Sequence, residues 1–197
     1  MAPTDIAIFA KAPIPGFAKT RLIPAIGAHA AAVLQERLTE RAVATAREAD
    51  LGPVTLWCAP DVTHRGFRDL GVALKPQPAG DLGARMLAAF EARPTLVIGT
   101  DCPALTAAHL NDAAAALETH DVVLIPAEDG GYVLIGARAT HPSLFTDMRW
   151  SVPSVLSETR TRIAARGLTS FELPPLWDVD TEDDLACMEH AFPELAL

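Results

Sequence analysis

The sequence has few cysteines, few aromatic residues and no long apolar run. Its 3 cysteines, Cys58, Cys102 and Cys187, lie far apart, and aromatic residues make up 6% of the 197 positions. An odd number of isolated thiols without zinc-like Cys/His spacing predicts neither a disulfide framework nor a zinc site. Unpaired cysteines are typical of a reducing compartment. The short apolar run that follows Asp5 is unlike a secretory signal. We therefore expect a cytoplasmic protein.

Basic residues are the minority among the charged side chains. The sequence has 16 Lys and Arg against 25 Asp and Glu, a net charge of -9. This balance excludes a broad surface for duplex DNA or anionic membranes, but it allows a local basic pocket for a nucleotide. No stretch reaches the roughly 20 apolar residues that span a bilayer. We therefore expect neither a nucleic-acid nor a membrane partner; the sequence leaves the oligomeric state open.

The hydrophobic fraction, 50%, is too high for a disordered chain, and the length suits one domain over residues 1–197. Short β-branched runs predict buried strands at residues 6–10, 54–59, 95–99, 122–125 and 132–135. Longer Ala-rich segments predict helices at residues 28–49, 82–92, 107–118, 155–166 and 181–191. Thr106 is the expected N-cap of one helix, and Gly167 the expected stop of another. The alternation predicts an α/β fold with a mainly parallel, mixed sheet.

Polar residues follow the predicted strands at their carboxyl ends, where open α/β sheets bind ligands. We therefore expect three separate loops to converge on one crevice that is basic on one side and acidic on the other. After the first strand comes KAPIPGFAKTRL, residues 11–22, with Lys11, Lys19 and Arg21. Lysine and arginine suit phosphate oxygens. The segment contains neither GxxxxGK[ST] nor GxGxxG, so it is neither a P-loop nor a Rossmann fingerprint. The alternative is a solvated loop whose charges serve solubility only.

Two further loops follow strands. Asp101, in GTDCP, is placed to bind a hard cation such as Mg²⁺ together with substrate phosphates. The alternative is an ordinary turn before Pro103. We expect Cys102 to be a small buried residue, not a nucleophile. Asp129, Gly130 and Gly131 predict a hairpin turn, which leaves Asp129 free to contact a substrate.

Near the C-terminus, WDVDTEDDL places Asp178 and Asp180 two residues apart, hence on one face of an extended segment. A metal-binding role competes there with a purely structural one. Thr181 and Asp184 fit the capping pattern of a helix N-terminus.

The segment KPQPAGDLGARM, residues 75–86, contains Gly80 and Gly83 ahead of a predicted helix. Backbone N–H groups in such a turn can bind a base or a phosphate. The alternative is a plain strand-to-helix turn. The six histidines are scattered without ligand spacing, so we expect surface or packing roles for them.

Taken in order, several blocks resemble the DUF2064 family over residues 5–187. The blocks are FAKAPIPGFAKTRL, QPAGDLGARM, GTDCP, DGGYVLIG, WSVPSVL and DVDTEDDL. That family is often labelled glycosyltransferase and is related to the molybdenum-cofactor and 2-phospholactate nucleotidyltransferases. The resemblance implies a single-domain three-layer α/β/α sandwich of the GT-A, or nucleotide-diphospho-sugar transferase, type.

The resemblance also implies roles for particular residues. Metal binding falls to Asp101 and Asp180, with Asp178 beside them, and the implied metal is Mg²⁺ or Mn²⁺. Asp101, Asp129, Lys19 and Arg21 are the implied catalytic residues. Gly130, Gly131 and Trp150 match motifs on the acceptor side. The residues implied to bind the nucleotide are Ala10, Lys11, Lys19, Arg21, Gln77, Gly80, Gly83 and Thr100.

The implied reaction is Mg²⁺-dependent transfer from a nucleotide-activated donor to a small-molecule acceptor. Glycosyl transfer from a nucleoside-diphosphate sugar is the first expectation. Nucleotidyl transfer from a nucleoside triphosphate, with release of pyrophosphate, is the alternative. The single Asp101, in place of the DxD of typical glycosyltransferases, resembles the nucleotidyltransferase relatives. A non-catalytic nucleotide-binding module on the same fold is the remaining hypothesis.

Overall fold

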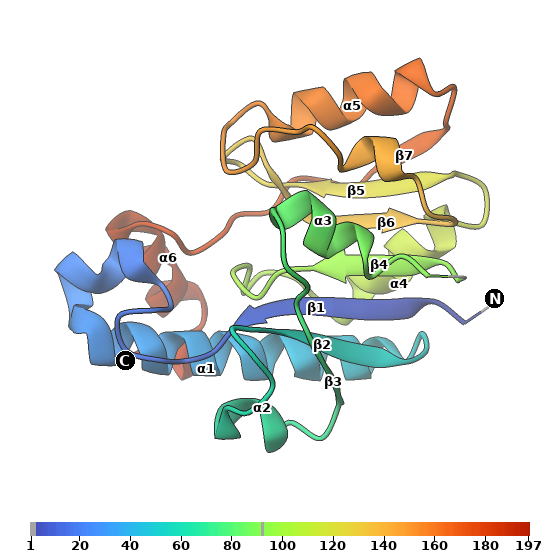
Figure 1. Ribbon diagram of the computed structural model, residues 1–197. Helices are drawn as coiled ribbons and strands as arrows, with labels where there is room; N and C mark the ends of the chain where they lie inside the picture. The colour runs from blue at the N-terminus through green and yellow to red at the C-terminus, as the bar shows by residue number, and fades with distance from the viewer. Residues whose placement is uncertain (1–2, 92) are drawn as a thin grey trace.

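The computed structural model describes residues 3–91 and 93–197 (Figure 1). A seven-stranded sheet has the order β3-β2-β1-β4-β6-β5-β7. The strands are β1 (Asp5–Lys11), β2 (Val54–Ala59), β3 (Ala73–Pro76), β4 (Thr95–Ile98), β5 (Val122–Pro126), β6 (Tyr132–Ala137) and β7 (Ser170–Glu172). Neighbouring strands pair in parallel, apart from β6, which is antiparallel to β4 and β5. The predicted mainly parallel, mixed sheet is confirmed.

Helices cover both faces of the sheet. They are α1 (Ile23–Ala49), α2 (Arg65–Arg68), α3 (Leu82–Leu87), α4 (Ala107–Ala116), α5 (Val155–Ala165) and α6 (Glu182–Ala191). One face packs its apolar side chains against α1, α2 and α4, and the other against α3 and α5. This arrangement is the expected three-layer sandwich. A third apolar cluster joins α6 to α1. In Figure 1, α6 lies on the side of the sheet where β1 ends.

Local sequence signals explain several helix ends. The side chain of Thr106 caps α4 by accepting a hydrogen bond from the His109 backbone, as predicted. Gly167, with φ 65°, follows the end of α5, as predicted. The predicted helix start at Ala28 corresponds to a kink, because Gly27 at φ 79° and ψ 159° interrupts α1.

Other boundaries differ from the predictions. β3, β7 and α2 were not predicted; β3 and β7 are short strands at the sheet edges with exposed positions and no continuous apolar run. The helix predicted over residues 82–92 ends at Leu87, because Ala89 and Phe90 continue as hydrogen-bonded turns. Ala92 lies outside the described residues. In the described part of the chain, no helix is both long and apolar enough to cross a bilayer.

Candidate functional site at the carboxyl edge of the sheet

A cavity of about 660 Å³ opens where β1 and β4 end and β6 begins. Side chains from segments far apart in the sequence line it. They include the predicted residues Lys11, Lys19, Arg21, Thr100, Asp101, Asp129, Asp178 and Asp180. The predicted convergence of the carboxyl-edge loops is therefore observed.

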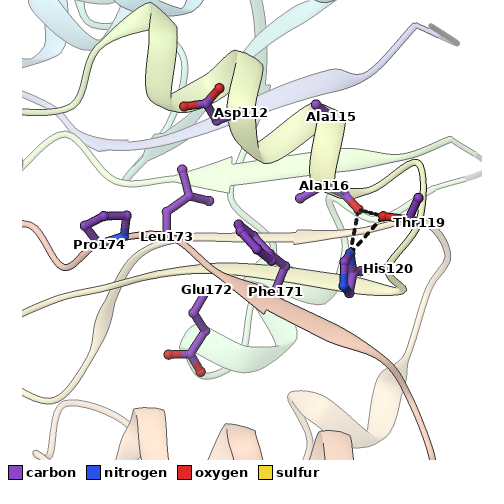
Figure 2. Close-up of a pocket in the computed structure, with 9 residues that line it drawn as sticks. All are labelled: Asp112, Ala115, Ala116, Thr119, His120, Phe171, Glu172, Leu173 and Pro174. Carbon is purple, nitrogen blue, oxygen red and sulfur yellow. Dashed lines mark hydrogen bonds between the residues drawn. The ribbon is translucent and has the colours of Figure 1, made fainter.

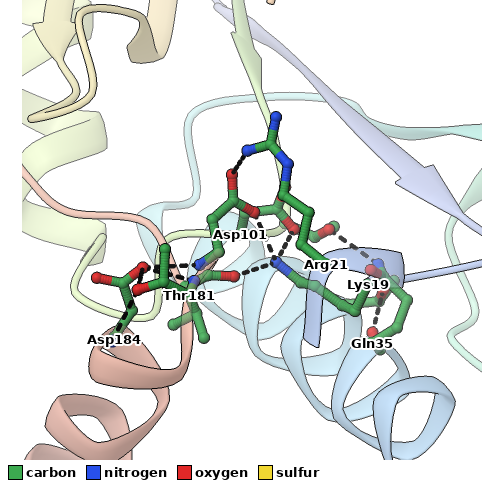
Figure 3. A network of polar contacts seen from close by, with 10 residues as sticks. Lys19, Arg21, Gln35, Asp101, Thr181 and Asp184 are labelled. Atoms are coloured by element: carbon green, nitrogen blue, oxygen red, sulfur yellow. Dashed lines mark hydrogen bonds and ion pairs between the residues drawn. The ribbon is translucent and has the colours of Figure 1, made fainter. Parts of the chain in front are cut away.

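Lys19 is the central cation of this cavity. Its backbone is left-handed, at φ 47°, just before the 3-10 turn Thr20–Leu22. Its side chain is only 5% exposed, and its Nζ lies 2.6 Å from Asp101 Oδ1. The same nitrogen donates to the Val179 carbonyl at 2.8 Å and lies 3.9 Å from Asp180 Oδ1 (Figure 3). Lys19 thus faces Asp101 and Asp180, two of the three carboxylates that the sequence singled out as metal ligands.

Arg21 and the backbone complete the link to the C-terminal segment. Arg21 Nη1 lies 3.0 Å from Asp180 Oδ2, and its side chain is 69% exposed. The Val179 N–H donates to the Asp101 carbonyl at 2.9 Å. Val179 itself is buried between α1 and α6, whereas Asp178 and Asp180 on either side line the cavity. The extended segment therefore places these two carboxylates toward the site, as its spacing predicted.

Asp178 has the most perturbed carboxyl group of the site. Burial raises its pKa to about 7, and the negative charges of Asp101, Asp129 and Asp180 contribute to the rise, against the opposing effect of Lys19. A carboxyl group with a pKa near neutrality can exchange protons at physiological pH. The sequence suggested Asp178 as a metal ligand and gave no sign of this acid–base property, because burial depends on the fold.

The donor set suits a magnesium ion that arrives with its substrate. Mg²⁺ takes oxygen ligands and is usually held by one or two carboxylates plus phosphate oxygens. Asp101 and Asp180 offer two carboxylates around one point, where the Lys19 ammonium lies in this structure. Within residues 3–91 and 93–197, no three His, Cys, Asp or Glu side chains form a ready metal cage. Asp101 and Asp180 fit part of the oxygen ligand set of a divalent ion.

Two amide side chains fix the loops on either side. Gln35, from α1, donates to Thr100 Oγ1 at 3.0 Å and so holds the residue before Asp101. Gln77 donates to the carbonyls of Ala10, at 3.3 Å, and Trp57, at 2.9 Å, tying the end of β3 to β1 and β2. Gln77 and Ala10 both line the cavity. Gln35 was not predicted, since nothing in a helical sequence marks which polar residue turns toward a loop.

The glycines near α3 have a packing role. Gly80 and Gly83 are not among the residues that line the cavity. A Cβ on Gly83 would lie 2.2 Å from the Phe145 carbonyl oxygen and 2.7 Å from the Trp150 ring. Close packing thus explains why a glycine occupies position 83. The predicted contact of Gly83 with a nucleotide remains a prediction. Arg85, in the same block, lines the cavity although it was not singled out.

The β5–β6 turn is both a hairpin and a wall of the cavity. Asp129 Oδ1 accepts a hydrogen bond from the Gly131 N–H at 2.8 Å, and Gly130 has φ 90°. The predicted hairpin is confirmed, and Asp129 also lines the cavity. Trp150 lines another wall of the cavity, and its Nε1 is buried without a hydrogen-bond partner among the described residues.

Cys102 does not have the properties of a nucleophile. Burial, with a smaller contribution from Asp178, raises the pKa of its thiol to about 12. A thiolate is the reactive form of cysteine, so a raised pKa disfavours attack at neutral pH. The raised pKa agrees with the expectation that Cys102 is not a nucleophile, but the residue is only partly buried, not buried as predicted.

A second hollow, of about 420 Å³, lies between α4 and β7 (Figure 2). Alanines and Phe171 form much of its wall. Glu172 pairs with Arg160 outside the hollow, and within its wall His120 Nδ1 lies within hydrogen-bond distance of Thr119 and Ala116. Unlike the larger cavity, this hollow has no facing cations and carboxylates among the described residues that line it.

Solved structures of similar fold include proteins named as transferases and a synthetase. A Desulfovibrio desulfuricans G20 protein, provisionally described as a nucleotide-diphospho-sugar transferase, is 27% identical, with a TM-score of 0.89 over 97% of this chain and 88% of its own. A CMP:2-keto-3-deoxy-manno-octonic acid synthetase complexed with CTP is 14% identical, with a TM-score of 0.61 over 98% of each chain.

A third solved structure also has a similar fold at low sequence identity. The 2-C-methyl-D-erythritol 4-phosphate cytidylyltransferase of Thermus thermophilus is 12% identical, with a TM-score of 0.59 over 96% of this chain and 98% of its own. The structures at 14% and 12% identity establish the fold alone. The first neighbour, at 27% identity, supports the expectation of a transferase.

No curated protein matches the chain. Residues 42–152 match the model of a family described as "Uncharacterized protein conserved in bacteria (DUF2064)". That match spans more than half of the 197 residues and includes the blocks from QPAGDLGARM to DGGYVLIG. The chain therefore belongs to the DUF2064 family.

Proposed function

We propose that the chain transfers a group from a nucleotide-activated donor to a small-molecule acceptor, with Mg²⁺ or Mn²⁺ bound between the protein and the donor phosphates. The observation that carries this proposal is the meeting of Lys19 with Asp101 and Asp180 in one cavity at the carboxyl edge. A hollow that combines carboxylates with cations suits a polyphosphate bound through a divalent ion.

Each part of the cavity has a role in this proposal. Asp101 and Asp180 hold the divalent ion, with Asp178 beside them. When bound, the ion neutralises charge on the leaving phosphate group. Lys11, which forms no ion pair within the described residues, contacts phosphate oxygens together with Lys19 and Arg21. Stabilisation of developing charge of this kind is usually the largest single contribution to catalysis.

Glycosyl transfer is the first candidate reaction. The bond between the sugar carbon and the diphosphate oxygen breaks, the acceptor oxygen forms the new bond, and the nucleoside diphosphate leaves with the bonding electron pair. The acceptor proton passes to a carboxylate. Asp129 is the candidate base from the sequence, and Asp178, whose pKa is raised to about 7, is a second one. The similarity to a nucleotide-diphospho-sugar transferase at 27% identity favours this reaction.

Nucleotidyl transfer is the second candidate. Here an acceptor oxygen attacks the α-phosphorus of a nucleoside triphosphate, and pyrophosphate leaves. The single Asp101 and the similarity of the fold to a cytidylyltransferase and a CTP-bound synthetase favour this reaction. Both reactions use the same cavity, so the geometry of the site does not separate them. The leaving group does: glycosyl transfer releases a nucleoside diphosphate, and nucleotidyl transfer releases pyrophosphate.

The test measures products with Mg²⁺ present. The chain is incubated with nucleoside-diphosphate sugars or nucleoside triphosphates and a panel of hydroxyl and phosphate acceptors, and free nucleoside diphosphate and pyrophosphate are assayed separately. Asp101→Asn should lower the rate of product release by about 10²–10³, the range seen when one charge-stabilising group is removed. Asp112→Asn, at an exposed position of α4, is the matched control and should retain the wild-type rate.

Calorimetry separates an enzyme from a binding module. A non-catalytic module binds nucleotide but releases neither product with any donor. The proposed site also predicts Mg²⁺-dependent nucleotide binding that Asp101→Asn weakens. Equal metal-dependent affinity in the wild type and this variant would contradict the assignment of Asp101.

A further inference from the structure

Lys19 lies where the proposed function requires a metal ion. Its Nζ is 2.6 Å from Asp101 Oδ1 and 3.9 Å from Asp180 Oδ1, and its side chain is 5% exposed. These are the same two carboxylates to which the divalent ion is assigned. A lysine that served only to bind phosphate would have no need to contact both of them (Figure 3).

A divalent ion and the Lys19 ammonium compete for these carboxylates. Both are cations that bind carboxylate oxygens, and like charges a few ångströms apart repel each other. The lysine side chain is a flexible four-carbon stem that carries a point charge, so it can move its charge without moving its backbone. Its contact with the Val179 carbonyl is a single hydrogen bond. The ammonium therefore balances carboxylate charge in the ligand-free site. Its contacts are non-covalent, so a metal ion and a phosphate can replace them.

We propose that Lys19 is an exchangeable counter-ion for the metal site. In the ligand-free protein its ammonium neutralises Asp101, shares Asp180 with Arg21, and keeps both carboxylates turned toward one point. When a divalent ion arrives with a polyphosphate, the ion takes the carboxylates and the ammonium moves to phosphate oxygens. Lys19 is in this respect a positioning residue. The inference rests on the proposed function, because it assumes that the metal binds at Asp101 and Asp180.

The exchange makes metal and polyphosphate binding mutually dependent. A metal that binds alone must displace Lys19 without giving its ammonium a new partner. A polyphosphate supplies that partner. The ligand-free wild type is therefore expected to bind a metal weakly, and the same site without the lysine charge is expected to bind it more tightly.

The experiment measures Mn²⁺ binding to the full chain without nucleotide, by electron paramagnetic resonance of free Mn²⁺ or by calorimetry. Lys19→Met removes the charge, and Lys19→Gln removes the charge but keeps a donor for the Val179 carbonyl. Either variant should bind Mn²⁺ about 10- to 30-fold more tightly than the wild type, from the Coulomb interaction of a unit charge with a divalent ion at about 4 Å. The gain in Mn²⁺ affinity that inorganic pyrophosphate brings should be at least about threefold smaller in the variants than in the wild type.

Lys75→Met is the matched control. It removes the same charge, but Lys75 pairs with one carboxylate, Glu91, at 2.8 Å on an exposed surface. Its Mn²⁺ affinity should stay within about twofold of the wild type, because exposed charges at a distance are largely screened. Circular dichroism confirms that each variant is folded, and Lys19→Gln decides the question if Lys19→Met does not fold.

The outcomes separate the exchange from the proposed function. If the wild type binds Mn²⁺ with pyrophosphate but the Lys19 variants bind Mn²⁺ alone no more tightly, the exchange is wrong and Lys19 is only a structural link to Val179. An equal increase in Mn²⁺ affinity in Lys75→Met also overturns the exchange, since the change in net charge would then explain the effect. If no form binds Mn²⁺ with or without pyrophosphate, both the exchange and the metal in the proposed function are wrong.

Discussion

At the scale of single residues, the site is a set of carboxylates whose mutual repulsion is offset by Lys19 and Arg21. Asp178 shows this repulsion most clearly, because burial and three neighbouring carboxylates raise its pKa to about 7. The two-residue spacing predicted that Asp178 and Asp180 share one face, and the resemblance to a known family implied that Asp101 joins them. It could not predict the raised pKa, which depends on how deeply each carboxyl group is buried.

The raised pKa of Asp178 predicts how stability varies with pH in the metal-free protein. In the unfolded chain the pKa is near the ordinary 3.8, so between about pH 4 and 7 the folded state holds more protons and loses stability as the pH rises. Asp178→Asn removes this loss. The variant should gain on the order of 2 kcal/mol over the wild type at pH 8, and little at pH 4.

Urea unfolding in EDTA at pH 4, 6 and 8 measures this difference. The difference in unfolding free energy between Asp178→Asn and the wild type should grow with pH and level off above about pH 7. A constant difference across the three pH values would show that Asp178 does not titrate in that range in the folded protein.

At the scale of elements, the sequence predicted those whose signals are local. The capping box of Thr181 and Asp184 begins α6 as expected, and five of the seven strands follow apolar runs. β3 and β7 were not predicted, because edge strands need only one neighbour and their residues, such as Phe171 at 45% exposure, need not be buried. Their place in the sheet is decided by pairing with β2 and β5.

The β5–β6 turn gives a prediction at this scale. Gly130 has φ 90°, and a Cβ there would lie 2.2 Å from the Pro153 carbonyl oxygen. Gly130→Ala therefore combines backbone strain with a clash. Gly16 is a matched control, because it has φ 84° but no atom within 4 Å of an added Cβ. Gly16→Ala should cost about 1–2 kcal/mol from strain alone.

Gly130→Ala should cost a further 1–3 kcal/mol, roughly the cost of overpacking. Denaturant unfolding of the two variants and the wild type gives both values. Equal losses for Gly16→Ala and Gly130→Ala would mean that the segment carrying Pro153 moves away without cost. That segment also contains residues that line the cavity, so its displacement should be visible as weaker nucleotide binding by Gly130→Ala.

At the scale of the whole molecule, the site exists only because the C-terminal segment around Val179 packs beside the loops that carry Lys19 and Asp101. Lys19 and Val179, 160 positions apart, are joined by a hydrogen bond, and the Val179 N–H reaches the Asp101 carbonyl. Sequence spacing cannot predict such contacts, since they depend on α6 packing against α1 through the third apolar cluster. The position of the loops at the strand ends predicted that they converge, and the resemblance to a known family implied that the C-terminal block belongs to the same site.

This dependence predicts which part of the protein opens first. The C-terminal unit, residues 177–195, is attached through a small apolar cluster and a few polar links, whereas β1 and β4 are central strands with buried side chains on both faces. Local opening is easiest where few buried contacts must be broken. Native-state hydrogen exchange should therefore find the amides of Val179 and α6 exchanging together, and well before those of Ile8 and Val97. Protection of Val179 equal to that of β4 would instead show that the two halves of the site form and open only with the whole fold.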